Sequence, residues 1–151
     1  MNYIQINAKE AAFYTSLRDV AKWLEIDLRD YDWHISDIEG AWYELDDPSW
    51  ISGKDLAAKI KEFDYQFVWA VISAFPIGTE PFTTNIPYAD GNPTFWEGEP
   101  QKQISNSLFE IVCWDSSATL FIGMQNDLEE KLLVNAPSLK KLDTKNERCK
   151  Y

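Results

Sequence analysis

Residues 67–75 read FVWAVISAF, a nearly unbroken apolar run that ends directly at Pro76. The run has the length of a strand, and proline cannot donate a hydrogen bond to continue it as an inner strand. A strand that is apolar at successive positions, and not only at alternate ones, is typical of one that is covered on both faces. We therefore expect a sheet built around this strand, with a packing layer on each side.

The remaining segments supply both helices and strands for one domain spanning residues 1–151, because 151 residues with 45% hydrophobic side chains suffice for one core. Periodicity predicts the following elements: strands at 3–7, 31–38, 42–45, 108–114, 118–123 and 138–142, and helices at 9–26, from Ser52 to Phe63, and at 127–136. The predicted class is α+β, with a mixed, largely antiparallel sheet of about five or six strands and helices chiefly on one face.

Residues 76–103 form a long excursion with five prolines and three glycines, which leaves little room for regular structure. The excursion also carries aromatic side chains, namely Phe82, Tyr88, Phe95 and Trp96, so we expect it to pack against the domain. Residues 145–151 are predicted to be a frayed tail.

The acidic charge is distributed unevenly along the chain. The formal net charge is −11, and residues 25–47 hold nine acidic residues against the single Arg29. This excess argues against contact with nucleic acid or with an anionic membrane surface. No run approaches the ~20 apolar residues of a membrane span, and no secretory signal is recognisable, so a cytoplasmic location is expected. The acidic face is interpreted either as a solvated surface or as a docking surface for a basic protein.

Seven tryptophans accompany this charge. Trp23, Trp33, Trp69 and Trp114 lie in periodic segments and are predicted core residues, whereas Trp42, Trp50 and Trp96 flank acidic or irregular segments. Aromatic anchors inside a charged rim are typical of protein–protein interfaces. The predicted partner-binding residues are Asp30, Asp32, Asp37, Glu39, Trp42, Asp46, Asp47, Trp50 and Trp96.

Signatures of catalysis are missing from the sequence. It holds neither a G-x-S-x-G elbow nor a phosphate-binding glycine loop, and Cys113 and Cys149 are too far apart for a zinc knuckle. Cys113 is predicted to be a small buried residue without a disulfide. The only histidine, His34, is predicted to lie on the surface, on the side of its strand opposite to Trp33 and Ile35. No catalytic residue, metal site or cofactor is predicted.

Four short motifs carry a resemblance: YDWHI at 31–35, AFP at 74–76, residues 109–115, and Asn135-Ala136. Together they resemble a small family of uncharacterised Firmicutes proteins that form a domain of unknown function. The resemblance implies a stand-alone bacterial α+β domain and no particular activity.

Small acidic bacterial proteins of one domain are also typical of immunity proteins. The sequence thus favours a non-enzymatic protein-binding module, most concretely an immunity-type inhibitor of a basic toxin or nuclease, with its oligomeric state open. Two alternatives stand beside it. One is a small hydrolase or carbohydrate-binding protein that uses carboxylates and exposed tryptophans, and the other is a phage-encoded acidic mimic of nucleic acid.

Overall fold

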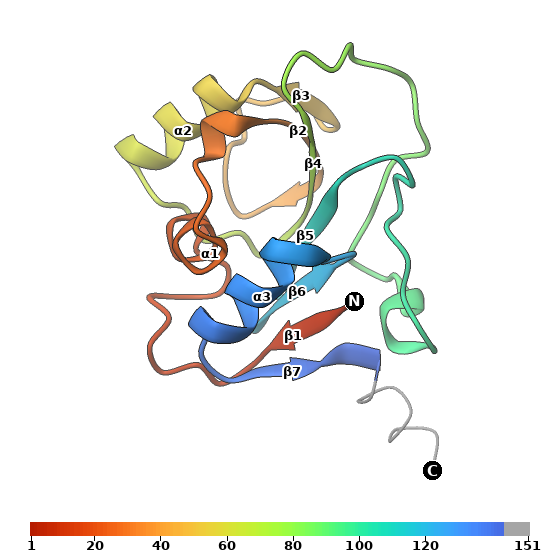
Figure 1. Cartoon of the computed structure of the whole chain (residues 1–151). Coiled ribbons are helices and arrows are strands. Elements are labelled where there is room, and N and C mark those ends of the chain that lie inside the picture. The colour runs from red at the N-terminus through yellow and green to blue at the C-terminus, as the bar shows by residue number, and fades with distance from the viewer. Residues whose placement is uncertain (144–151) are drawn as a thin grey trace.

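A computed structural model describes residues 1–143, and all of its strands belong to one sheet (Figure 1). The strand order is β3-β2-β4-β5-β6-β1-β7, and every neighbouring pair is antiparallel. The strands are β1 (Tyr3–Gln5), β2 (Tyr31–Glu39), β3 (Ser49–Ile51), β4 (Trp69–Pro76), β5 (Phe109–Trp114), β6 (Ala118–Ile122) and β7 (Leu139–Lys141). The helices are α1 (Leu17–Leu24), α2 (Gly53–Glu62) and α3 (Asn126–Asn135), with two short 3-10 helices, η1 (Leu28–Asp30) and η2 (Pro93–Trp96). The α+β class is confirmed, with seven strands in place of five or six.

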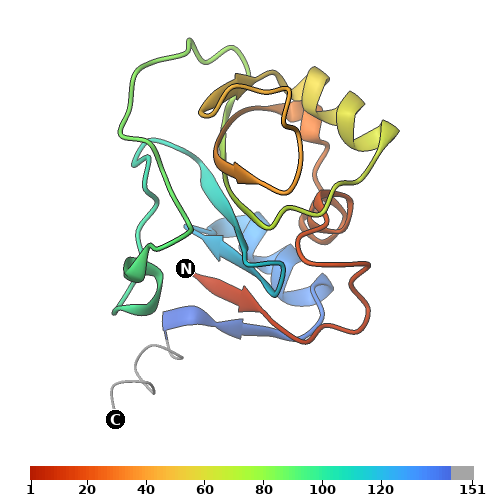
Figure 2. The ribbon, with the colours of Figure 1, turned by 180° about the vertical axis from the view of Figure 1, so that it is seen from behind.

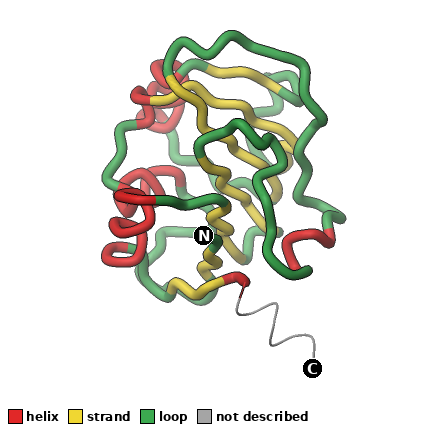
Figure 3. The backbone as a smooth tube through the Cα atoms, turned by 45° about the vertical axis from the view of Figure 1, so that its right-hand side comes forward, coloured by secondary structure: helices red, strands yellow, loops and turns green. Residues whose placement is uncertain are grey.

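The helices α1, α2 and α3 gather on one side of the sheet, and a long loop that contains η2 lies on the other (Figure 3). Side chains of β4 alternate between the two layers. Ala70, Ile72 and Ala74 join the core beneath the helices, whereas Val71 joins a second core on the opposite face. This double burial is the reason that the strand is apolar at almost every position, as the sequence predicts.

The second layer is the chain between β4 and β5, called here the 77–108 segment, which lies at the left when the molecule is seen from behind (Figure 2). Ala89 and Phe95 of this segment are buried and pack with Val71 and Val112 of the sheet. Its expected packing against the domain is confirmed.

The first helix is shorter than predicted. Residues 9–16 form turns and bends, and α1 begins only at Leu17. Ser16 is its N-cap, because the Ser16 side chain accepts a hydrogen bond from the backbone N–H of Asp19. An N-cap of this kind fixes the start of a helix, so α1 begins here although apolar residues at helical spacing precede it.

The predicted strand at 42–45 is wrong, because the strand that pairs with the outer edge of β2 comes later in the chain. The partner is β3, in which Trp50 lies opposite His34, and residues 40–48 form a loop. The helix after Ser52 is confirmed, with Ser52 as its N-cap. Phe63, just after this helix, and Leu133 on α3 are exposed. The predicted edge strand near residue 140 is β7, and the predicted tail at 145–151 lies outside the described residues.

Candidate functional site

The loop between β2 and β3 carries Glu44, Asp46 and Asp47, and Glu39 ends the strand before it. Residues 39–48 are called the acidic loop. The chain leaves β2 through a register shift between Ser36 and Glu39 and then turns at Gly40. Gly40 has φ +94°, and a Cβ there would lie 2.7 Å from Cγ2 of Val68. Only glycine fits this turn without displacing Val68.

Trp42 fixes the acidic loop from inside. The sequence predicts Trp42 to be a partner-binding residue, but its exposed fraction is 2%. The ring packs edge-on against Phe67 and Tyr65, with centroid distances of 4.8 and 5.7 Å, and the ammonium of Lys59 lies 5.4 Å from the Trp42 ring centroid. The prediction of a surface position for Trp42 is therefore wrong, because the turn at Gly40 directs this side chain into the core beneath the helices.

Two carboxylates hold the acidic loop to its surroundings. Asp47 accepts hydrogen bonds from the backbone N–H groups of Asp37 and Ile38, at 2.9 and 2.8 Å. Asp37 in turn accepts from the backbone N–H groups of Ala89 and Asp90, at 2.8 and 2.9 Å. Asp47 thus ties the acidic loop to β2, and Asp37 ties β2 to the 77–108 segment. Hydrogen bonds to charged acceptors are stronger than those to neutral acceptors.

Tyr43 projects from this fixed loop with an exposed fraction of 85%. The charged residues around it in the chain are Glu39, Glu44, Asp46 and Asp47. Within residues 1–143 only two ion pairs form, Arg29 with Asp27 and Lys59 with Glu44, so the other carboxylates of the loop have no cationic partner there. Sequence reasoning missed Tyr43, because residues 40–48 form a loop and no periodic pattern in the sequence indicates which of its side chains are exposed.

The predicted partner-binding residues do not form one patch. Asp30 ends η1 and Asp32 lies at the start of β2, whereas Glu39 lies at the other end of this strand. Asp32 is also structural, since it accepts from the backbone N–H groups of Gly53 and Gly78. Asp37, Glu39, Asp46 and Asp47 do come together at the acidic loop.

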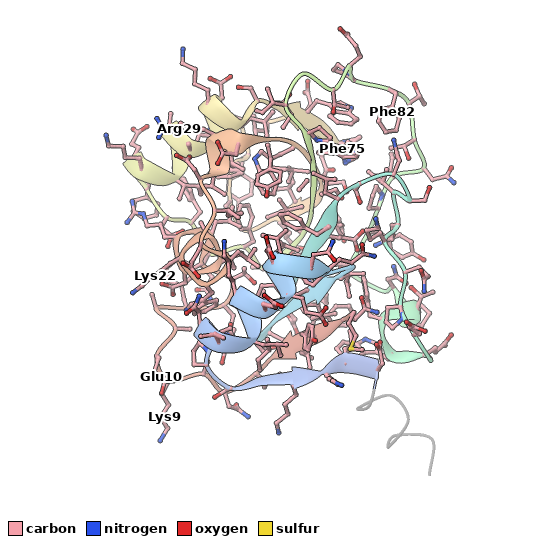
Figure 4. The ribbon with its side chains drawn as sticks, in the orientation of Figure 1. Lys9, Glu10, Lys22, Arg29, Phe75 and Phe82 are labelled. Atoms are coloured by element: carbon pink, nitrogen blue, oxygen red, sulfur yellow. The ribbon has the colours of Figure 1, made fainter. Side chains whose placement is uncertain are left out.

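The two remaining predicted tryptophans are half-buried. Trp50 on β3 packs at a tilt against Phe75 and Phe82, with ring centroids 5.0 and 5.1 Å away. Figure 4 shows Phe75 of β4 near Phe82 of the 77–108 segment. Trp96 packs edge-on against Trp114 at 4.8 Å. Neighbouring rings therefore cover part of Trp50 and part of Trp96, and only the rest of each side chain is accessible to a partner.

A second group of polar residues lies in the interior, beneath the 77–108 segment. His34, Ser73 and Glu110 are opposite one another on β2, β4 and β5, and each is at most 1% exposed. The surface position predicted for His34 is wrong. It does point away from Trp33, but that face of the sheet is covered. The residues on either side of Ser73 and of Glu110 in the sequence are apolar, so sequence reasoning did not identify either as a candidate site residue.

Burial determines the protonation of these groups. Desolvation raises the pKa of Glu110 to about 7, although the backbone N–H of Gln103 donates to its carboxylate at 2.9 Å. Desolvation lowers the pKa of His34, against the opposing field of Asp47. The pKa of the buried Cys113 thiol is raised to about 12, which keeps it protonated and unreactive.

The order of these residues differs from that of a hydrolytic triad. Acyl transfer requires the histidine between the serine and the acid, whereas here Ser73 lies between His34 and Glu110. Ser73 Oγ has no hydrogen-bond partner among the described residues. Nor does any group of three His, Cys, Asp or Glu residues in the described part of the chain have the arrangement of a metal site.

No helix within residues 1–143 combines the length and the apolar character needed to cross a membrane. Comparison of the chain with protein-family models, with curated proteins and with solved structures finds no match.

Proposed function

We propose that this protein is a non-enzymatic binding module that recognises a basic protein through its acidic loop, as an immunity-type inhibitor would recognise a toxin or nuclease. The observation that carries the proposal is an 85% exposed Tyr43 in a loop whose carboxylates Glu39, Asp46 and Asp47 lack cationic partners among residues 1–143. A large aromatic side chain within a charged rim is the usual composition of an interface hot spot.

Preorganisation supports this function. Trp42 anchors the loop in the core, and Asp47 fixes it to the backbone of β2. A partner would meet a loop whose shape is already set, so that little ordering entropy is lost on binding. The unpaired carboxylates would attract a basic partner over distance and accelerate the encounter.

The first experiment tests contact at Tyr43. A photo-crosslinking amino acid replaces Tyr43, and in a matched control it replaces Val134, which is 83% exposed on α3. Irradiation in the native host is expected to give a discrete adduct with a basic protein at position 43 and none at position 134. The proposal is rejected if position 43 gives no adduct, or if both positions give the same adducts.

The second experiment measures the association and dissociation rates of the partner that crosslinking has identified, purified in its free form. Glu39→Lys combined with Asp46→Lys is expected to slow association at least tenfold at low salt, and the effect should shrink as screening shortens the range of the charges to ~8–10 Å. The matched control combines Glu80→Lys with Glu130→Lys, two exposed acidic residues outside the loop. Equal losses in the two double variants would show that net charge, and not the acidic loop, determines binding.

A further inference from the structure

The interior row of His34, Ser73 and Glu110 contains three buried polar atoms without a hydrogen-bond partner among the described residues: His34 Nδ1, Ser73 Oγ and Glu110 Oε1. Buried polar atoms are nearly always paired in folded proteins. Three such atoms on directly opposed residues of neighbouring strands indicate a common explanation.

The register places the three side chains within reach of each other. His34 is opposite Ser73 in the β2–β4 pairing, and Ser73 is opposite Glu110 in the β4–β5 pairing. Directly opposed residues have Cβ atoms about 4.5–5.5 Å apart, so a rotation of the Ser73 side chain or one bridging water can connect them. All three point toward the 77–108 segment, because their neighbours Trp33, Ile72 and Phe109 belong to the core beneath the helices.

The donors and acceptors of the row match in either direction. A protonated Glu110 can donate to Ser73 Oγ, whose hydroxyl then donates to an unprotonated His34 Nδ1. An ionised Glu110 can only accept, so that Ser73 donates to it and accepts from a protonated His34 Nδ1. In both cases all three atoms are satisfied, and the neutral histidine carries one ring proton.

We propose that Glu110, Ser73 and His34 form one hydrogen-bonded chain across the sheet, whose direction reverses when Glu110 loses its proton. In that step the carboxyl proton leaves to solvent, the Ser73 hydroxyl rotates, and the single ring proton of neutral His34 moves from Nε2 to Nδ1 by exchange with solvent. The row is thereby a pH-sensitive switch beneath the 77–108 segment.

The switch is connected to that segment. Glu110 accepts a hydrogen bond from the backbone N–H of Gln103. The side-chain amide of Gln103 accepts one from the backbone N–H of Tyr88 at 3.1 Å and donates one to the carbonyl of Tyr88 at 2.9 Å. The charged groups that act on the row are Lys102 near Glu110 and Asp47 near His34, while Ser73 brings no charge from β4. Near neutral pH, therefore, Glu110 is the member of the row that gains or loses charge.

The single histidine makes the test direct. Long-range ¹H–¹⁵N correlation spectra of the labelled full chain record both imidazole nitrogens from pH 5 to pH 9. Reversal shifts the two ¹⁵N resonances in opposite directions, whereas protonation of His34 brings them to a common value. We expect reversal with a midpoint near pH 7, matching the ¹³C carboxyl titration of Glu110.

Three variants test whether hydrogen bonds through Ser73 couple the protonation of Glu110 to the tautomer of His34. Glu110→Gln should abolish the reversal, and Ser73→Ala should abolish it while Glu110 still titrates. Ser73→Thr retains the hydroxyl and should restore it, and it also provides a readout if Ser73→Ala does not fold. A wild-type tautomer that stays constant while Glu110 titrates, or reversal that persists in Ser73→Ala, would overturn the proposal.

Discussion

Two adjacent aromatic residues of the acidic loop have opposite roles. Trp42 is 2% exposed and Tyr43 is 85% exposed. Truncation of a buried tryptophan typically costs about 3–5 kcal/mol, whereas surface changes stay within about 0.5 kcal/mol. We expect Trp42→Ala to lower the free energy of unfolding by several kcal/mol and Tyr43→Ala to leave it nearly unchanged, as measured by urea unfolding. A strong destabilisation by Tyr43→Ala would show that Tyr43 packs against the domain.

At this scale, sequence reasoning identifies the acidic loop more reliably than the direction of its side chains. Asp37, Glu39, Asp46 and Asp47 do lie together, since they are close in the chain and the β2–β3 connection is short. The positions of Trp42 and His34 were missed for a different reason. Each depends on rings that pack against it from later segments of the chain: Tyr65 and Phe67 contact Trp42, and Trp50 contacts His34.

Among the elements, β4 was predicted best because its apolar run is explained by burial on both faces. Val71 is fully buried beneath the 77–108 segment, so an unpaired aspartate there should cost several kcal/mol out of a total stability of roughly 5–15 kcal/mol. Val71→Asp should prevent cooperative folding. The same change at the exposed Val134 is the control and should leave the melting transition almost unchanged, as followed by circular dichroism. A cooperative transition near the wild-type temperature in Val71→Asp would contradict the assignment of β4.

The short elements were harder to predict because pairing and capping define them more than periodicity does. The three residues of β3 form a strand only because His34 and its neighbours pair with them. Apolar spacing before Leu17 suggested helix, but Ser16 and Asp19 form a local cap that starts α1 later. The S-x-x-D spacing was present in the sequence and, read as a cap, would have given the correct start.

For the whole molecule, pH acts on a chain of net charge −11 that buries one carboxyl and one imidazole in the same row. The pKa of Glu110 is raised from 4.5 to about 7 in the folded protein, so the unfolded chain releases this proton first as pH rises. The stabilising contribution of protonated Glu110 is therefore complete below pH 4.5 and is lost as pH rises to about 7. Its magnitude is on the order of 3 kcal/mol. The pKa of His34 is lowered, so its own contribution acts in the opposite sense and falls as pH drops below 6.5.

Glu110→Gln isolates the carboxyl contribution, because the carboxamide keeps the shape of the side chain and an acceptor for the N–H of Gln103 but cannot ionise. Urea unfolding at several pH values between 4 and 8 should show wild-type stability falling relative to that of the variant as pH rises, with most of the change between pH 5 and pH 7. The charge of all other groups is common to both proteins and cancels in this difference. In a His34→Gln background, the stability difference caused by Glu110→Gln should remain, whereas the loss of stability that His34 causes below pH 6.5 should disappear. A difference between wild type and Glu110→Gln that stays constant across this range would mean that Glu110 ionises in the folded protein as it does in the unfolded chain, and that the interior beneath the 77–108 segment is open to water.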